Sequence, residues 1–536
     1  MSSSLSRPGG DGPQPARAIP KPIVILIHPP VVKPSEPPAG LAKLSAALKG
    51  RDLHHIPVDA NLEAMLYLLG HASLAGPDVW TARAHKHIRR NLASLRERAT
   101  YRSFGRYQRA VADVNRLLAA SAAASVRMSL ADYEDRRLSP QKSGDLIYAA
   151  EHPEESVFYP YFSMRLTGLM GDNGSAPIVG FSLNYLSQAL PTFAMAGFVR
   201  KELPGARIVL GGSLVTSWAS NPSWKNPFQG LVDEVVPGPG EDALLSMIGE
   251  KSDESLLAPS FDGLPLDQYL SPGLVLPYSA SRGCYWRRCS FCPEKTEGTP
   301  YRPTPQDLVT RHLRELSSRH RPSLIHLVDN ALSPALMERI AEAPFGVPWC
   351  GFARFVPLLA DVDFCKALKA SGCVMVKLGL ESGDRHVLEA LEKGLSLETA
   401  ARALAALKEA GVATYVYLLF GTPPETKASA QRTLDFVAAH SGSIDFLNVA
   451  IFNLPVHCVE AGTLELRPFY DGDLALYADF VHPLGWDRRA VRLFLDKEFR
   501  RHPAIRPIIL RQPPLFTSNH APFFRMDQPV SGPAAP

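Results

Sequence analysis

The stretch Ser279–Lys295, "SASRGCYWRRCSFCPEK", places three of the chain's seven cysteines within nine positions. Four residues stand between Cys284 and Cys289, and two residues, the second of them Phe291, stand between Cys289 and Cys292. Such crowding of thiols in a short loop indicates a shared role for the three side chains. Three thiols at this spacing fit packed core cysteines, a structural zinc site or an iron–sulfur cluster.

The surroundings of the loop separate these three possibilities. Neighbouring glycine, arginine and proline residues are unusual for cysteines packed in a core strand. A structural zinc site needs four ligands, and the next candidates downstream, His312 and Cys350, lie far along the chain. An iron–sulfur cluster is held by thiolates, and three thiolates leave one iron open to a small molecule. The loop therefore favours an iron–sulfur cluster.

Downstream of the loop, strand-like and helical patterns alternate. Short apolar runs such as "SLIHLVDN" at 323–330 and "CVMVKLGLES" at 373–382 recur between helical segments such as "TAARALAALKEAG". Six such runs lie within 274–460. Their spacing predicts β/α units that form a partial (β/α)6 barrel of the TIM type.

Upstream of the loop, residues 21–255 show a second α/β pattern. The apolar runs "IVILI" at 23–27 and "IVL" at 208–210 are typical of buried strands and alternate with helical patterns. This alternation predicts a doubly wound, Rossmann-like sheet, which binds ligands at the carboxyl ends of its strands. Arg- and Ala-rich stretches predict a helical insertion at about 75–165, and the Pro-, Gly- and Asp-rich residues 256–273 predict a linker.

The end of the chain carries less information. A mixed helical extension is predicted over 461–528. Its aromatic stretch around Phe516, His520 and Phe523 fits either the mouth of a substrate site or packing against the barrel, and we expect packing.

Composition and termini bound the class of protein. The 536 residues carry a net charge of +4 without a basic run, which argues against nucleic acid as a partner. No apolar run approaches the roughly 20 residues that span a bilayer, and the first residues lack the apolar core of a signal peptide. A disordered leader is expected over 1–20 and a disordered tail over 529–536. An odd number of cysteines without an export signal predicts reduced thiols and a cytoplasmic protein.

The cysteine loop resembles that of the radical S-adenosylmethionine (SAM) superfamily, which follows the first barrel strand. Usually three residues separate the first two cysteines, whereas four do so here. The resemblance implies that Cys284, Cys289 and Cys292 hold a [4Fe-4S] cluster and that SAM binds the open iron. Reductive cleavage of SAM would then give a 5′-deoxyadenosyl radical that abstracts hydrogen from the substrate.

The resemblance also implies polar SAM-binding groups at the carboxyl ends of the barrel strands. The segment "HLVDN" at 326–330 departs from the Gly-Gly-Glu-like motif that is usual at its position, whereas "LGLESG" at 378–383 fits more closely. Aromatic Phe291 belongs to the cysteine loop itself. The expected SAM-binding residues are Phe291, Asp329, Asn330, Arg354, Glu381 and Ser382.

The N-terminal half lacks the Gly-x-Gly-x-x-Gly turn, which disfavours a nicotinamide dinucleotide. Its segments "PSEPPAGLAKLSAAL" at 34–48 and "GPGEDALL" at 238–245 resemble the cobalamin-binding subfamily of radical SAM proteins. Small residues at successive strand ends, in "FSLNY" and "LGGS", resemble positions that contact the cobalamin tail. The expected cobalamin-binding residues are Ser182, Asn184, Gly211, Gly212, Ser213, Gly238 and Glu241.

One departure from many cobalamin domains concerns the cobalt ligand. The motif Asp-x-His-x-x-Gly, whose histidine binds cobalt from below, does not occur in this sequence. His28, His54 and His55 are the nearest candidates, and we expect none of them to bind cobalt.

The resemblance implies a radical SAM enzyme that transfers a methyl group to an unactivated carbon or phosphorus. A radical SAM oxidoreductase or cyclase without net methyl transfer is the alternative, and a non-catalytic cobalamin or iron–sulfur sensor is a third possibility. The implied partners are a small-molecule, lipid or peptide substrate and an electron donor such as flavodoxin or ferredoxin.

Overall fold

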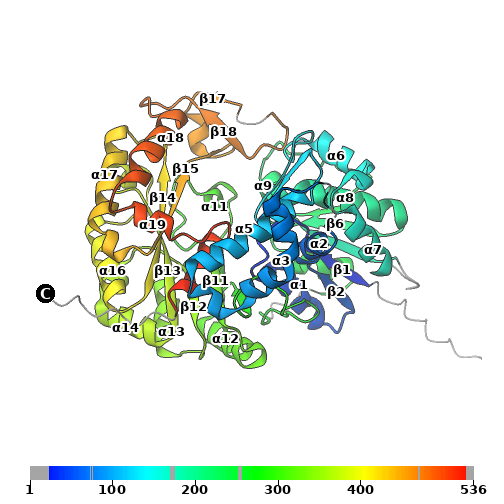
Figure 1. Ribbon diagram of the computed structural model, residues 1–536, viewed down its shortest axis with the longest axis horizontal. Coiled ribbons are helices and arrows are strands. Elements are labelled where there is room, and N and C mark those ends of the chain that lie inside the picture. The colour runs from blue at the N-terminus through cyan, green and yellow to red at the C-terminus, as the bar shows by residue number, and fades with distance from the viewer. Residues whose placement is uncertain are drawn as a thin grey trace, which may run out of the picture.

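The computed structural model of the protein describes residues 23–526 apart from 73, 75, 170–175, 252–255 and 469–470. The leader and tail expected from the sequence lie outside the described residues. Two parallel β-sheets with flanking helices make up the body of the molecule, which confirms the expected α/β class (Figure 1). Within the described ranges, no helix is both long enough and apolar enough to cross a membrane.

The first sheet has five parallel strands in the order β2-β1-β5-β6-β7. Val24 and Leu26 of β1 pack into a core with helices α1 and α10, whereas Ile25 and Ile27 pack into a core with α2 and α8. Burial on both faces explains why β1 is a continuous apolar run. The strands are β1 (Val24–Ile27), β2 (His55–Val58), β5 (Ile178–Ser182), β6 (Arg207–Gly211) and β7 (Glu234–Val236).

The helices of the first sheet follow from local capping and composition. Asp59 caps α2, because its carboxylate accepts a hydrogen bond from the Leu62 backbone N–H at 3.0 Å. Gly212 precedes α9 with a φ of 111°, and a Cβ on it would lie 2.3 Å from the carbonyl oxygen of Leu183, so only glycine fits there. The helices are α1 (Ala39–Lys49), α2 (Ala60–Gly70), α8 (Leu186–Glu202), α9 (Ser213–Ala219) and α10 (Glu241–Met247).

A mainly helical segment lies between α2 and β5. It also contains a short antiparallel hairpin, β3–β4, whose three-residue strands are too short to show a period in the sequence. Helices α3 and α5 pack against each other and cross the front of the molecule in Figure 1. The elements are α3 (Val79–Arg96), α4 (Arg98–Tyr101), α5 (Phe104–Ala120), β3 (Val126–Met128), β4 (Tyr133–Asp135), α6 (Ser143–Glu151) and α7 (Tyr159–Leu169).

The second sheet has six parallel strands in the order β15-β14-β13-β12-β11-β8, the reverse of their order in the chain. Every strand-like run that the sequence shows between 274 and 460 forms one of these strands. They are β8 (Val275–Tyr278), β11 (Leu324–Leu332), β12 (Trp349–Ala353), β13 (Cys373–Glu381), β14 (Ala413–Phe420) and β15 (Phe446–Ile451).

Helices cover one face of this second sheet, at the outer side of Figure 1. Val376 and Leu378 of β13 pack toward them, and side chains alternate along a strand, so Lys377 and Glu381 lie on the opposite, inner face. The helices are α12 (Gln306–His320), α13 (Pro334–Glu342), α14 (Val362–Ala370), α15 (Arg385–Ala390), α16 (Leu397–Glu409) and α17 (Lys427–Ala439).

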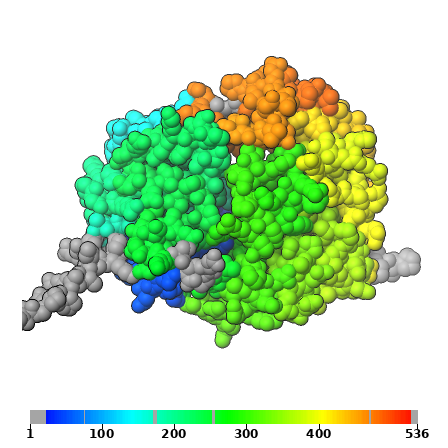
Figure 2. Space-filling model, turned by 180° about the vertical axis from the view of Figure 1, so that it is seen from behind, coloured from blue at the N-terminus to red at the C-terminus, as the bar shows by residue number. Residues whose placement is uncertain are grey.

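The C-terminal segment contacts both halves of the chain. Figure 2 shows its orange part lying across the junction between the two halves. The imidazole of His520 is fully buried, stacks on Phe516 with ring centroids 3.9 Å apart, and bonds to the Tyr107 hydroxyl at 3.0 Å. This stretch therefore packs in a core, as expected. The elements are β16 (Leu454–Pro455), β17 (Leu466–Arg467), β18 (Tyr477–Phe480), α18 (Arg488–Lys497) and α19 (Arg506–Leu510).

Candidate functional site

The cysteine loop begins at the carboxyl end of β8 and folds around one small pocket. Strand β9 (Ser281–Arg282) pairs with β10 (Arg302–Pro303), which closes the loop at its base. The short helix α11 (Pro293–Thr296) begins directly after the third cysteine. The thiols of Cys284, Cys289 and Cys292 are free and line the pocket together with Arg287, Glu294, Lys295 and Thr299.

Trp286 anchors this loop to the second sheet. Its indole N–H donates to the Glu392 carbonyl oxygen at 2.9 Å, and its ring lies against Gly394. A Cβ on Gly394 would approach Cζ2 of Trp286 to 1.9 Å, so the loop sits where it does because residue 394 has no side chain. Gly394 also has a φ of 62°, a conformation that favours glycine.

The three thiols are a donor set that fits an iron–sulfur cluster, because thiolates hold such clusters and all three cysteines line one pocket. Burial raises the pKa of Cys292 to about 11, so its thiolate needs nearby positive charge to form.

Arg354 supplies positive charge beside the cysteines. Its Nη1 lies 3.7 Å from Sγ of Cys289, and its guanidinium stacks over the Trp286 ring at 4.3 Å from the centroid. It also donates to the carbonyl oxygen of Lys393. Arg354 is buried, and these three contacts fix the planar group against the loop.

Glu381 and Lys393 form a second charged group at the same place. Nζ of Lys393 lies 2.8 Å from Oε1 of Glu381 and 5.6 Å from the centroid of the Phe291 ring. Glu381 has a φ of 67°, and the pairing of β13 with β14 is irregular next to it. Such a bulge re-aims a side chain near a site, here toward Lys393. Phe291, Arg354 and Glu381 thus all lie by the cysteine loop.

The other expected SAM-binding residues are placed differently. Asp329 accepts hydrogen bonds from the Ala280 N–H at 3.0 Å and the Ser281 hydroxyl at 2.5 Å, so it supports the strand that leads into the loop. Burial raises its pKa. Ser382 is fully buried and bonds to the Thr433 hydroxyl at 3.2 Å. Asn330 is exposed. The hydrogen bonds of Asp329 and Ser382 thus go to residues other than Arg354, Glu381 and Lys393.

Sequence reasoning missed a buried charged chain on the inner face of the second sheet. Nδ1 of His326 lies 2.9 Å from Oε2 of Glu36, and Nζ of Lys377 lies 2.7 Å from Nε2 of His326. Glu36 comes from the loop after β1, so this chain joins the two halves. Burial, followed by the charge of Lys377, lowers the pKa of nearby Lys33 to about 8. In the sequence, only the acidic residue Glu36 in the otherwise uncharged segment "PSEPP" could have indicated an ion pair with another part of the chain.

A cavity of about 460 Å³ opens at the carboxyl ends of the first sheet's strands. Its other walls come from the cysteine loop: Arg282, Glu294 and Thr299 line it too. Glu294 and Thr299 therefore face both this cavity and the cysteine pocket. All the expected cobalamin-binding residues line this one cavity: Ser182, Asn184, Gly211, Gly212, Ser213, Gly238 and Glu241.

No histidine stands among the described residues that line the cavity. His28 is buried and is not one of these lining residues, and burial lowers its pKa, with Asp59 opposing that shift. Glycines and small residues dominate the strand ends, and Asn184 donates to the Ser182 hydroxyl at 3.1 Å while accepting from the Ser213 N–H at 3.0 Å. The cavity offers backbone and small polar groups to a ligand.

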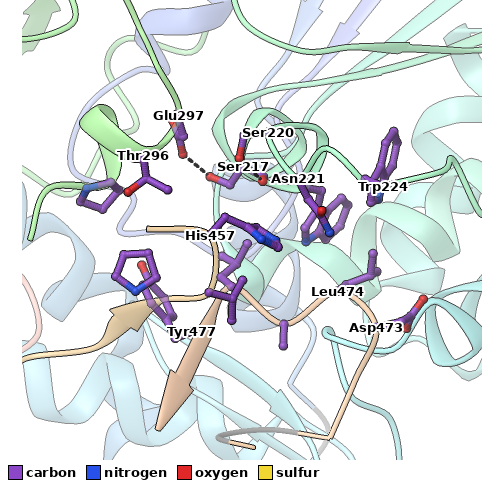
Figure 3. A pocket seen from close by; sticks show the side chains of 16 residues that line it. Ser217, Ser220, Asn221, Trp224, Thr296, Glu297, His457, Asp473, Leu474 and Tyr477 are labelled. Atoms are coloured by element: carbon purple, nitrogen blue, oxygen red, sulfur yellow. Dashed lines mark hydrogen bonds between the residues drawn. The ribbon is translucent and has the colours of Figure 1, made fainter. Parts of the chain in front are cut away.

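Two ion or hydrogen-bonded pairs connect the halves at this cavity. Arg282 pairs with Glu241 at 2.7 Å. The Ser217 hydroxyl donates to Glu297 at 2.5 Å, and Figure 3 shows this contact at the edge of a second, smaller pocket. That pocket is lined by side chains of α9 and the residues after it, of α11 and the following Glu297, and of the C-terminal segment, with His457 pointing into its centre. Glu297 lines both this pocket and the larger cavity.

Comparisons with known proteins agree with this geometry. Residues 278–437 match the model of the Radical SAM superfamily. An uncharacterized methyltransferase from Pyrococcus horikoshii is 27% identical over 203 residues, which are 36% of this chain and 43% of the relative. The anaerobic magnesium-protoporphyrin IX monomethyl ester cyclase of Rubrivivax gelatinosus is 24% identical over 180 residues, 32% of each chain. The match thus spans less than half the length of either curated relative.

A solved structure shares the fold over more of the chain. The radical SAM methyltransferase TsrM from Kitasatospora setae, determined with cobalamin and a [4Fe-4S] cluster bound, superimposes with a TM-score of 0.50 at 17% identity. The match covers 85% of this chain and 82% of that one. The fold of most of this chain, including both sheets, therefore resembles that of a solved structure. Residues 278–437, which contain the cysteine loop and most of the second sheet, form a domain of the radical SAM superfamily.

Proposed function

We propose that the protein is a cobalamin-dependent radical SAM enzyme that transfers a methyl group to an unactivated carbon or phosphorus atom. The observation that carries this proposal is the shared wall of Glu294 and Thr299 between the cysteine pocket and the cavity of the first sheet. Because the same two residues line both, the small cysteine pocket lies directly beside the larger cavity. This arrangement suits a reaction that needs a group bound at the cysteines and a second group bound in the cavity.

In this proposal Cys284, Cys289 and Cys292 hold a [4Fe-4S] cluster, and the cavity holds cobalamin. When bound, the cluster would supply the electron that splits a C–S bond of SAM, and cobalamin would carry the transferred methyl group. Three free thiols around one pocket and the adjacent Arg354 support the first assignment. The small residues at the strand ends support the second, because they let a large ligand approach the backbone.

The protein's own side chains would orient SAM beside the cluster. Arg354 offers a buried guanidinium that complements a carboxylate, and Glu381 offers a carboxylate that complements an ammonium group. Phe291 packs against the same group. We propose that these three residues, rather than Asn330 or Ser382, carry most of SAM recognition in this chain.

We propose that no histidine of this chain binds cobalt. The described residues that line the cavity include no histidine, and His28 is buried outside that lining. We also propose the domain limits expected from the sequence. The electron donor would resemble flavodoxin or ferredoxin, and the substrate would be a small molecule, a lipid or a peptide.

A cyclase or oxidoreductase reaction without methyl transfer is the second candidate. It is supported by the similarity to the magnesium-protoporphyrin IX monomethyl ester cyclase, which is of the same order as the similarity to the methyltransferase. Both reactions would use the same radical step. They differ in the products that SAM leaves behind.

Product analysis after anaerobic reconstitution with iron, sulfide and hydroxocobalamin tests the proposal. With a reductant, SAM should yield 5′-deoxyadenosine and also S-adenosylhomocysteine. 5′-Deoxyadenosine alone would favour the cyclase. Neither product, despite a full complement of iron, would overturn the enzyme assignment and favour a sensor.

The matched variants are Cys289→Ala and Cys365→Ala. Both remove a buried thiol, but Cys365 lies in α14 and hydrogen-bonds only to the Leu359 carbonyl oxygen. We expect Cys289→Ala to lose the cluster absorbance and all SAM cleavage, and Cys365→Ala to keep both. Equal iron content in the two variants would contradict the assignment of the cluster ligands.

A further inference from the structure

A second large cavity, of about 460 Å³, lies away from the cysteine loop. Three parts of the chain that are distant in sequence form its walls: the helical segment after α3, the start of β15 and the C-terminal segment. The lining residues are Tyr101, Arg102, Phe104, Phe446, Arg511, Phe523, Phe524 and Arg525.

The position of this cavity separates it from the proposed reaction. Phe446 is the first residue of β15, whereas the cysteine loop follows the last residue of β8. All strands of the second sheet are parallel, so these two points lie at opposite edges of the sheet. A ligand here would not share the space proposed for SAM or cobalamin.

Positive charge dominates the cavity. Arg102, Arg511 and Arg525 line it, and Arg525 pairs with the nearby Asp445 at 2.5 Å. Burial lowers the pKa of Arg511, the charge of Arg525 lowers it further, and Asp445 opposes the shift. Guanidinium groups that line one cavity offer charge-assisted hydrogen bonds to an anion that enters it.

The remaining walls are aromatic. The ring of Phe524 packs edge-on against Phe104 and at a tilt against Tyr101, with centroids 5.4 Å apart in each pair. The guanidinium of Arg525 lies 5.9 Å from the Phe446 ring centroid. Such walls accept a flat or apolar body, while guanidinium groups bind phosphate or carboxylate oxygens.

We propose that this cavity is a second ligand site, which binds an anion attached to an aromatic or apolar body. Phosphate and carboxylate share the chemistry that the arginines recognise. The charge selects the anionic group, and the aromatic walls add affinity for what it is attached to.

Isothermal titration calorimetry on the full-length protein at low ionic strength tests this site. The probes are phenyl phosphate, benzoate, inorganic phosphate and benzyl alcohol. We expect saturable one-site binding of phenyl phosphate or benzoate, and at least about tenfold weaker binding of inorganic phosphate and benzyl alcohol, since each lacks one of the two features. Equal affinity for inorganic phosphate would mean a bare anion site, and no binding of any anion would overturn the proposal.

Variants assign the binding to this cavity. Arg511→Gln and Arg102→Gln should each weaken binding of the preferred probe about tenfold, because each removes a charged hydrogen-bond donor. Arg102 is exposed, so its loss tests the site even if Arg511→Gln fails to fold. The control Arg89→Gln changes an exposed arginine of α3 outside the cavity and should leave the affinity unchanged. Unaltered affinity in Arg102→Gln, or in a folded Arg511→Gln, would overturn the proposal.

Discussion

At the scale of single residues, Arg354 joins the cysteine loop to the second sheet. Its guanidinium contacts a cysteine sulfur, an indole ring and a backbone carbonyl at once. A lysine has the charge but neither the planar face nor the fork of donors. The site therefore depends on the shape of this group as well as on its charge.

The substitution Arg354→Lys tests that dependence. We expect SAM binding to weaken by about tenfold, because stacking on Trp286 and the bond to the Lys393 carbonyl are lost while the charge remains. Equilibrium binding of SAM to the reconstituted protein measures the effect. Arg288→Lys is the control, since the guanidinium of that arginine also lies over the Trp286 ring, 5.2 Å from its centroid. Equal affinities would show that charge alone suffices.

Two glycines near the loop allow a matched test of its anchor. Gly394 and Gly298 have φ angles of 62° and 67°, but a Cβ would strike Trp286 only from Gly394 and would meet nothing within 4 Å at Gly298. Gly298→Ala should cost about 1 kcal/mol from the backbone alone. Gly394→Ala should cost about 1–3 kcal/mol more and shift the tryptophan fluorescence, because the indole must move. Chemical denaturation measures both, and similar losses would contradict the anchoring role.

At the scale of elements, the loop after β1 reaches from the first sheet to the second. Burial raises the pKa of Glu36, but the charge of His326 and its hydrogen bond, with Lys377 and Lys33 nearby, bring the pKa below its ordinary value. His326 and Lys377 stand on β11 and β13, so three elements meet in one charged chain. Removing one partner of such a buried group leaves the others uncompensated.

The buried charged group of Glu36, His326 and Lys377 predicts that the free energy of unfolding depends on pH. A carboxyl whose pKa is lowered in the folded state stabilises the protein above its unfolded pKa of about 4.3, and that contribution is lost as pH falls through the folded value. Glu36→Gln should therefore lower the free energy of unfolding by about 2 kcal/mol at neutral pH. The difference from the parent should shrink in acid. Urea unfolding at several pH values measures it, and a constant difference would contradict this role.

The elements also show what the sequence can and cannot predict. Most strands of the two sheets contain a short apolar run, because burial leaves a strong signal in composition. The hairpin β3–β4 left no such signal. Lys393 and Trp286 could not be identified either, since their roles depend on how the segments after β13 and β8 meet in space. Ser382 followed the expected motif, yet the fold uses its hydroxyl to bond with Thr433.

At the scale of the whole molecule, the parts built on the first and the second sheet meet around the cavity at the strand ends of the first sheet. Arg282 and Glu241, one from each half, form an ion pair beside it, and the C-terminal segment covers the junction (Figure 2). A cofactor in this cavity would contact both halves. Its retention should therefore depend on how firmly they are held together.

The substitution Arg282→Met tests this dependence. We expect the protein to retain several-fold less cobalamin after gel filtration, because one wall of the cavity loses its bond to the other. The control Arg319→Met breaks a similarly exposed pair with Asp262 at 2.6 Å, which does not line the cavity. Corrinoid absorbance per chain measures retention. Equal retention in both variants would show that this pair does not hold the cavity closed.

The partition formed by Glu294 and Thr299 has a consequence for how such a protein can change. A larger side chain at position 299 would intrude on two compartments together, and a smaller one would enlarge both. A substitution at either of these two positions therefore changes both spaces together, whereas residues that line only one space can alter it alone.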